Sequence, residues 1–358
     1  MRGMVIDRMV RALWDHVNID LEGGEKMELD ELLNNAPRND LIGNSLIKTH
    51  AKLEMYDKIL CSVSGGSDSD ILIDLCEKYG FNNKITYVFF DTGLEFDATK
   101  EHLTYLEQRY DVNIERIKAF KPIPICCREY GQPFLSKQVS EWIERLQRHD
   151  FQWEDKPFDE LYKEYPNCKA ALRWWCNAFG GEERGKESSF NIASNQYLKE
   201  FMVKNPPQFK ISNKCCLYAK KKVAHSYKEK GDFDLNIYGV RKAEGGVRRS
   251  AYKTCFSSNA ECDEYRPIFW YLKDTKELYD KHYGIIHSRC YSEYGLKRTG
   301  CAGCPYSKCF EEELRVMKQY EPLLHKAVSH IFADSYAYTR AYRNFILQKR
   351  NNTKKARR

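Results

Sequence analysis

The pattern of apolar and polar residues predicts an α/β protein. A short apolar run, KILCSV, ends just before Gly65 and Gly66, as is typical of a strand followed by a turn. The next segment, DSDILIDLCEKYG, is amphipathic and stops at a glycine, so it predicts a helix. KITYVFFDTG repeats the strand pattern, and LNIYGVR is a further strand candidate. Because strand, helix and strand follow in this order, we expect a parallel sheet with helices on both faces.

Helical patterns flank this unit on both sides. Apolar residues recur at helical spacing between residues 4 and 13, and SKQVSEWIERLQRH predicts a helix capped by Ser136. Another helix is expected from Glu311 onward, and the basic end, KKARR, is expected to be mobile. We therefore predict an N-terminal helical extension at 1–48, an α/β domain at 49–310 with a helical insertion at about 136–210, and a C-terminal helical segment with a basic tail at 311–358.

Composition narrows the class of protein and the compartment. The 358 residues contain no uninterrupted apolar run of about 18 and no signal-peptide core, so we expect a cytoplasmic protein without a membrane span. In a reducing compartment, 14 cysteines indicate metal or cluster ligation and buried thiols rather than a disulfide framework. The net charge of +7 suits an anionic substrate.

The segment SGGSDS, Ser64 to Ser69, lies between a predicted strand and a predicted helix. Glycine amides and serine hydroxyls there face the positive end of the helix dipole, where a phosphate is readily held. The segment is not a Walker A loop, because no Gly-Lys-Ser/Thr follows. The pattern favours an anion site over the alternative, an ordinary tight turn.

Three further candidate residues are charged. Asp91 ends a predicted strand, at the sheet edge where open α/β sheets bind ligands, although a strand-end acid can also cap a turn. Arg241 and Arg248 bracket a flexible EGG segment, which suits a loop that folds over phosphates. Solvation at the surface is the alternative for both arginines.

The cysteines form two notable pairs. KCC contains Cys215 and Cys216, and CAGCP contains Cys301 and Cys304. Together they offer four soft ligands for zinc or an iron–sulfur cluster, and four buried structural thiols are the alternative. Adjacent cysteines are awkward for zinc, so the spacing favours a cluster. Nearby cations would favour the bound thiolates; the candidates are Lys214, Lys297 and Arg298.

These motifs resemble a known family. SGGSDS resembles the pyrophosphate loop of the PP-loop ATP pyrophosphatases, the adenine nucleotide alpha hydrolase-like superfamily. VFFDTGLEFDATKEHL and GVRKAEGGVR resemble two signatures of the phosphoadenosine phosphosulfate (PAPS) reductase family, and the likeness extends over about 58–310. It implies the PP-loop fold, a bound adenine nucleotide, and catalytic roles for Asp68, Arg241 and Arg248. The implied nucleotide-binding residues are Ser64, Gly65, Gly66, Ser67, Asp68, Ser69, Asp91, Thr92 and Gly93.

The resemblance also bears on the cysteines. Adjacent cysteines followed about eighty residues later by Cys-x-x-Cys are similar to the pattern that holds a [4Fe-4S] cluster in the adenosine-phosphosulfate-reducing branch. However, sulfonucleotide reductases carry their nucleophilic cysteine in a C-terminal Glu-Cys-Gly-x-His segment. No cysteine follows Cys309 in this sequence, so the reductase step has no residue at its usual place.

Three functions remain as hypotheses. The first is an enzyme that cleaves ATP with Mg²⁺, adenylates a nucleic-acid or small-molecule acceptor, and transfers sulfur from a donor protein, as DNA phosphorothioation enzymes and tRNA thiolases do. The second is a sulfonucleotide reductase that uses an unorthodox thiol, such as Cys126 or Cys127, and a thiol reductant. The third is a nucleotide-binding module without turnover.

The nucleic-acid acceptor is suggested by stacking surfaces and by cations. Trp174 and Trp175 offer aromatic rings, and the tail offers basic side chains. The alternative is that both tryptophans lie in the core. We also expect a homo-oligomer.

Overall fold

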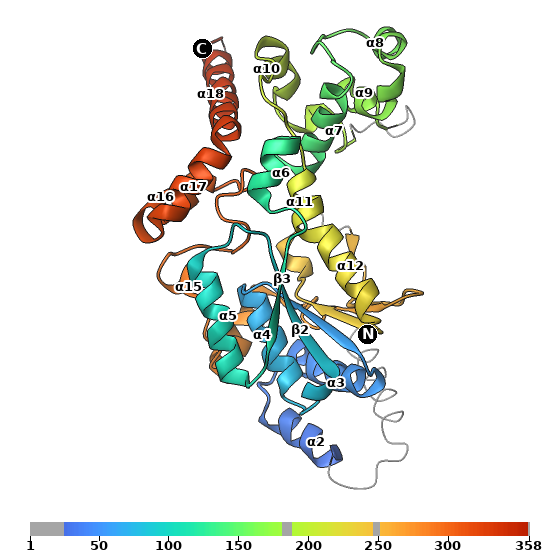
Figure 1. Ribbon diagram of the computed structural model, residues 1–358, viewed down its shortest axis with the longest axis vertical. Helices are drawn as coiled ribbons and strands as arrows, with labels where there is room; N and C mark the ends of the chain where they lie inside the picture. Colours follow the sequence, from blue (N-terminus) through green and yellow to red (C-terminus); the bar gives the residue numbers. More distant parts are fainter. Residues whose placement is uncertain (1–24, 181–187, 246–250, 357–358) are drawn as a thin grey trace.

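A six-stranded sheet with the order β3-β2-β1-β4-β6-β5 forms the centre of the molecule (Figure 1). The structure is a computed structural model that describes residues 25–180, 188–245 and 251–356. All strand pairs are parallel except β5 with β6, so the predicted α/β class is confirmed, with one antiparallel edge. The strands are β1 (Ile59–Val63), β2 (Ile85–Asp91), β3 (Ile114–Lys118), β4 (Leu235–Tyr238), β5 (Phe256–Ser257) and β6 (Asp263–Tyr265).

The central strand β1 pairs with β2 on one side and with β4 on the other. Its pairing register sets Ile59 against both Ile85 and Leu235, so the carboxyl ends of all three strands point to the same sheet edge. The loops after β1 and β4 therefore leave from neighbouring strands. This is the position at which open α/β sheets form a ligand crevice.

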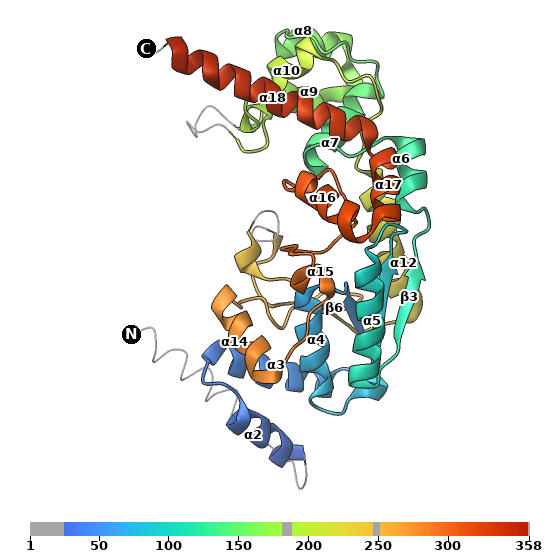
Figure 2. The same ribbon diagram turned by 90° about the vertical axis from the view of Figure 1, so that its left-hand side faces the viewer.

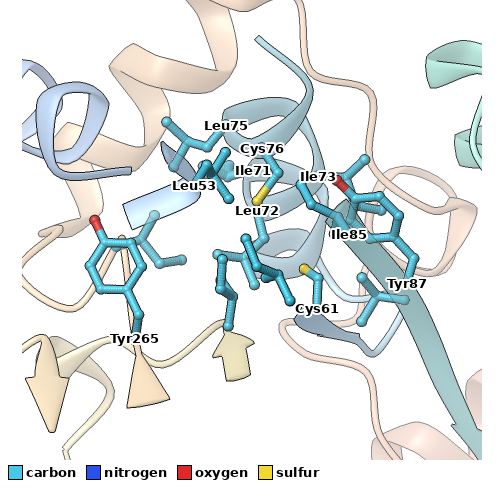
Figure 3. Close-up of a cluster of buried hydrophobic side chains, with 14 of the residues drawn as sticks. Leu53, Cys61, Ile71, Leu72, Ile73, Leu75, Cys76, Ile85, Tyr87 and Tyr265 are labelled. Carbon is cyan, nitrogen blue, oxygen red and sulfur yellow. The ribbon is translucent and has the colours of Figure 1, made fainter. Parts of the chain in front are cut away.

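Helices cover both faces of the sheet, as predicted. On one face, α4 (Ser67–Glu77) and α3 (Asp40–Met55) enclose the main core, in which Ile71, Leu53 and Tyr265 are fully buried or nearly so (Figure 3). On the other face, Leu60 and Val88 pack beside α12 (Lys222–Gly231). The two faces alternate along β1 because successive strand side chains point in opposite directions.

The remaining helices lie at the two ends of the molecule and along one side (Figure 1). They are α2 (Glu25–Asn35), α5 (Asp97–Tyr110), α6 (Ile123–Tyr130), α11 (Lys214–Cys216), α14 (Lys273–Tyr283), α15 (Arg289–Ser292), α16 (Phe310–Tyr320) and α17 (Pro322–Ile331).

The predicted N-terminal extension differs from the structure at its boundary. Its segment 4–13, predicted to be helical, lies outside the described residues. Helix α3 runs across the predicted boundary at residue 48 and packs into the core.

The insertion forms a separate helical layer with its own core. The predicted helix is α7 (Lys137–Gln147), and the Ser136 hydroxyl caps it by accepting from the Val139 amide at 3.2 Å. The layer also contains α8 (Phe158–Glu164), α9 (Lys169–Trp175) and α10 (Leu198–Lys204). Trp174 and Trp175 are 1% and 0% exposed inside this core. The interpretation of these two rings as a stacking surface for nucleic acid is therefore wrong.

The C-terminal segment is one long helix, α18 (Ala333–Ala356), which runs beside the insertion (Figure 2). Tyr342 is buried against the insertion, and its hydroxyl donates to the Gln196 carbonyl at 2.7 Å. The prediction of a mobile KKARR tail is wrong as far as Ala356, because an anchored helix made of good helix formers extends beyond its packed part. No described helix has the length and apolar character that crossing a bilayer requires.

Candidate functional site

The SGGSDS segment forms the turn between β1 and α4. Gly65 has a φ of +63°, a conformation that favours glycine, and a Cβ there would lie 2.7 Å from Thr99 Cγ2. Gly66 is the residue before the first turn of α4, and a Cβ on it would lie 3.0 Å from Thr299 Oγ1. Close packing therefore favours glycine at both positions, and both glycines are buried beneath neighbouring side chains.

Hydrogen bonds hold the loop in shape. The Ser69 hydroxyl accepts from the Ser64 amide at 2.9 Å and lies 2.8 Å from the Ser64 hydroxyl. The Ser67 amide donates to the Tyr291 hydroxyl at 3.1 Å. Tyr291 thus fills the acceptor position in front of this amide, a position that suits a phosphate oxygen. Sequence reasoning missed Tyr291, which lies far along the chain with no local signal.

Asp68 and Arg241 form an ion pair across the crevice. The Arg241 Nε lies 3.0 and 2.9 Å from the two carboxylate oxygens of Asp68, and both side chains are 18% exposed. Asp68 is in the first turn of α4, and Arg241 follows β4. Gly239 allows the close approach, since a Cβ there would lie 3.3 Å from Asp68 Cβ. The structure therefore joins two predicted catalytic residues that are 173 positions apart in the sequence.

A cavity of about 230 Å³ opens beside this ion pair. Lys297 and Arg298, which we expected beside the cysteines, line this cavity instead, and Glu244 in the same lining pairs with Arg298 at 4.0 Å. Three cations and two carboxylates leave the described lining with a small positive excess. Lys297 and Arg298 follow Tyr291 along a segment that crosses in front of the loop. The other lining residues that bear on binding are Ser64, Ser67, Asp68, Arg241 and Thr299.

The Asp91-Thr92-Gly93 turn lies elsewhere on the same edge and does not line this cavity. Asp91 Oδ1 accepts from the Gly93 amide at 2.8 Å, so one of its oxygens caps the turn. The buried Thr92 hydroxyl donates to Glu95 at 2.5 Å and lies 3.8 Å from the Cys301 sulfur. The turn thus contacts the cysteine segment. Arg248 lies outside the described residues.

The two cysteine pairs meet behind this turn. Cys215 and Cys216 are neighbours in α11, and Cys216 interacts electrostatically with both Cys301 and Cys304. Cys127 adds a fifth thiol, in contact with Cys215. In the part of the chain that the structure describes, no three His, Cys, Asp or Glu side chains are grouped to hold one metal ion.

Burial and nearby lysines control the charge at the cysteines: Cys215 and burial raise the pKa of Cys216, and Lys137 and Lys220 oppose this rise. Burial raises the pKa of the Cys304 thiol to about 12 and also raises the pKa of Cys301. Desolvation would lower the pKa of Lys220, but Cys301 and Glu95 outweigh it and raise that pKa. Lys220 lies in a π-helical turn, Leu217–Lys221, directly after the first cysteine pair. Lys220 therefore has the role beside the thiolates that the sequence analysis gave to Lys214, Lys297 and Arg298.

A buried polar network centred on Asp70 contacts the loop through the Ser67 carbonyl. Asp70 is fully buried and accepts from His102 at 2.9 Å and from His287 at 2.6 Å. His287 also contacts Asp280 at 3.0 Å, and Lys276 links Asp280 to the Ser67 carbonyl at 3.1 Å. Burial would lower the pKa of His287, but Asp280 and Asp70 raise it to about 9, against the opposing charge of Lys276. The network therefore holds a charged histidine under the loop.

Comparison with known proteins shows which family this part of the chain resembles. Residues 58–126 match the family model of the phosphoadenosine phosphosulfate reductase domain. This match confirms the predicted resemblance to the PAPS reductase family. It covers the PP-loop and the Asp91 turn and ends before the Arg241 and cysteine segments. The strand order and the match agree with the predicted PP-loop fold. No curated protein matches the sequence.

Three solved structures are similar to this PAPS reductase-like chain. A PAPS reductase from Candida auris, in a phosphate complex, has 10% identity and a TM-score of 0.42 over 79% of this chain and 97% of that one. The U34-tRNA thiolase NcsA from Methanococcus maripaludis, with its [4Fe-4S] cluster, has 12% identity and a TM-score of 0.36 over 84% and 79%. An NH3-dependent NAD synthetase from Campylobacter jejuni has 12% identity and a TM-score of 0.33 over 83% and 94%.

The ion pair generates a prediction about nucleotide affinity. We expect Arg241→Ala to weaken binding of a non-hydrolysable ATP analogue about ten- to a hundredfold, because a charge-assisted hydrogen bond contributes about 1.5–3 kcal/mol. Asp68→Ala is expected to weaken it as well, since it frees Arg241 from its fixed position. Isothermal titration calorimetry measures both. Arg116→Ala, which breaks a surface pair with Glu107, is the control, and an unchanged affinity for Arg241→Ala would contradict the prediction.

The buried network generates a prediction about pH. Because the pKa of His287 is raised from 6.5 to about 9 on folding, its charge stabilises the fold fully below pH 6.5, and this contribution is lost as pH rises towards 9. In the wild type, we expect this effect to lower the free energy of unfolding by about 1–2 kcal/mol between pH 6.5 and pH 9, after discounting for solvent screening. We expect His287→Gln to lack this decrease. Urea unfolding below pH 6.5 and near pH 9 measures it. The exposed His225→Gln should leave the pH profile as in the wild type.

Proposed function

We propose that this protein is an ATP pyrophosphatase-type sulfurtransferase that adenylates a nucleic-acid or small-molecule acceptor. One observation carries the proposal: the PP-loop with Arg241 and the four-cysteine site lie on the same sheet edge, joined by the segment 297–304. Residues 310–358 hold no cysteine that could act as the reductase nucleophile, which favours transfer over reduction.

The nucleotide would be held by its phosphates. The N-terminus of α4 offers the helix dipole and the Ser67 amide, where a phosphate oxygen would displace the Tyr291 hydroxyl, and Lys297 and Arg298 add positive charge. Mg²⁺ would enter with the triphosphate, since it prefers phosphate oxygens and a few carboxylates. Arg241 would stabilise charge that develops on the α-phosphate, after exchanging part of its contact with Asp68.

The cysteine site fits a [4Fe-4S] cluster. Cys215, Cys216, Cys301 and Cys304 converge from two segments into one buried region, and Lys220 offsets thiolate charge. A cluster is larger than a single ion and takes one thiolate at each of four corners, so its sulfur ligands stand further apart than those of zinc. With all four corners bound by cysteine thiolates, a cluster there would have no open iron, so it would supply electron transfer and would hold the two cysteine segments together. Zinc is the less favoured occupant.

The chemistry balances with a sulfide donor. An acceptor oxygen attacks the α-phosphorus of ATP, and the bond to the β-phosphate breaks to release pyrophosphate. The donor sulfur then attacks the adenylated position of the acceptor, and AMP leaves with the original oxygen. Within this chain, the loop would bind the departing pyrophosphate, and the cationic cavity would offset its charge.

A contact in the structure favours a second candidate function, sulfonucleotide reduction. The Cys127 thiol touches Cys215, and Cys126 lies next to it in α6. One of these thiols would replace the missing C-terminal nucleophile by attacking the sulfur of a phosphosulfate nucleotide, and a thiol reductant would then release sulfite. Sulfite formation from PAPS or its unphosphorylated analogue, lost in Cys127→Ser, is the distinguishing result.

The proposal predicts coupled release of AMP and pyrophosphate. Anaerobically purified protein, given ATP, Mg²⁺, a sulfide donor and candidate acceptors, should form both products in equal amounts. Chromatography of the nucleotides and an enzymatic pyrophosphate assay measure them. Tight ATP binding without either product, for every acceptor, would reject the transferase and favour a nucleotide-binding module.

The cluster assignment predicts a spectroscopic loss. We expect Cys301→Ser to lose most of the visible absorbance and bound iron of the anaerobic protein, because it removes one of four ligands. The exposed Cys309→Ser is the matched control and should keep both. Metal analysis separates the alternatives: zinc in place of iron, or iron retained in Cys301→Ser, would show that the assignment is wrong.

A further inference from the structure

A second cavity lies beside the first cysteine pair. It has a volume of about 580 Å³ and is lined by residues of α7, of the start of α9, and of α11 with the turn that follows it; Figure 1 shows where these helices lie. Cys216, a proposed cluster ligand, forms part of its wall. The PP-loop cavity includes none of its described lining residues. Cys216 therefore borders a cavity that is separate from the PP-loop cavity.

The lining of this cavity is strongly basic. Its described walls carry five lysine and arginine side chains and only two glutamates, together with His149. Both glutamates are already paired within the wall: Glu141 contacts Arg145 at 2.5 Å, and Glu144 contacts Arg148 at 3.0 Å. The carboxylates therefore leave part of the positive charge uncompensated.

Two lysines are free to bind an anion. Among the described residues, neither Lys137 nor Lys221 has an ion-pair partner, and both are exposed. Lys137 stands at the start of α7, and Lys221 ends the π-helical turn after the cysteines. Their positions on two different elements suit a ligand that enters between the elements.

The walls favour recognition of phosphate over recognition of bases. No Phe, Tyr or Trp is present among the described lining residues, so the stacking contacts used to bind nucleobases are missing. Lysine and arginine side chains are the usual partners of phosphate oxygens. The volume lies within the range of sites that take a nucleotide-sized ligand.

We propose that this cavity binds the phosphate group of the sulfur acceptor, with Lys137 and Lys221 as its principal contacts, next to Cys216. The role as acceptor site rests on the proposed function, whereas the binding of a phosphate-bearing ligand does not. The phosphate belongs either to a nucleic-acid strand or to a free nucleotide.

The experiment measures binding without ATP. The probes are a short fluorescein-labelled single-stranded oligonucleotide, followed by anisotropy, and cytidine monophosphate as a competitor. We expect Lys137→Glu with Lys221→Glu to weaken oligonucleotide binding about tenfold or more, and to lower the log–log salt slope by about 1 to 2. Lys230→Glu with Lys281→Glu, exposed lysines outside the cavity, makes the same change in net charge and should alter affinity less than about twofold.

The two probes distinguish the sources of the phosphate. Competition by cytidine monophosphate that is lost in the cavity variant supports a site for a single phosphate group, and binding of the oligonucleotide alone supports a strand. Equal weakening by the cavity and control pairs, or no binding of either probe to the wild type, would overturn the proposal. Lys137→Gln with Lys221→Gln, checked by thermal melting, repeats the test without charge reversal.

The outcome is separable from that of the proposed function. Lack of pyrophosphate release with cavity-dependent binding would reject the transferase and leave the phosphate site. Pyrophosphate release with equal binding in all variants would reject the phosphate site alone.

Discussion

The side-by-side parallel pairing of β1 with β4 is the constraint on which the candidate site depends. It brings the PP-loop and Arg241 to one sheet edge, where Arg241 contacts both carboxylate oxygens of Asp68 at about 3 Å. Glycine permits this close approach at positions 65, 66 and 239, since a Cβ on any of the three residues would crowd a neighbour. Packing and one ion pair together therefore fix the shape of the loop at the N-terminus of α4.

Helix α15 and the segment after it link this loop to the cysteines. Tyr291 in α15 contacts the Ser67 amide, Lys297 lines the PP-loop cavity, and Cys301 lies 3.8 Å from the Thr92 hydroxyl just after β2. One short stretch of chain thus touches both halves of the site. This continuity gives a physical basis for coupling nucleotide chemistry to sulfur chemistry in the proposed function.

The helical insertion contributes a wall of the site as well as a core. Trp174 and Trp175 fill its interior, while α7 turns basic side chains towards the cavity next to Cys216. Long charged side chains remain at the surface because burying them without a partner is costly. The same helix therefore supplies an apolar face for stability and a cationic face for binding.

Local pattern was enough to predict the first strands, α4, α7 and the glycine turn, because periodicity and turn chemistry are properties of neighbouring residues. The motifs also singled out Asp68, Arg241 and the four cysteines. Tyr291 and His287 were missed because their partners, Ser67 and Asp70, lie 224 and 217 positions away. Lys220 was missed because it acts on Cys301 and Glu95 in other segments, and no local signal marks such pairs. Long-range packing decides three further features: the placement of Lys297 away from the thiols, the burial of both tryptophans, and the helical C-terminal end. Contacts of this kind cannot be inferred from neighbouring residues in the sequence.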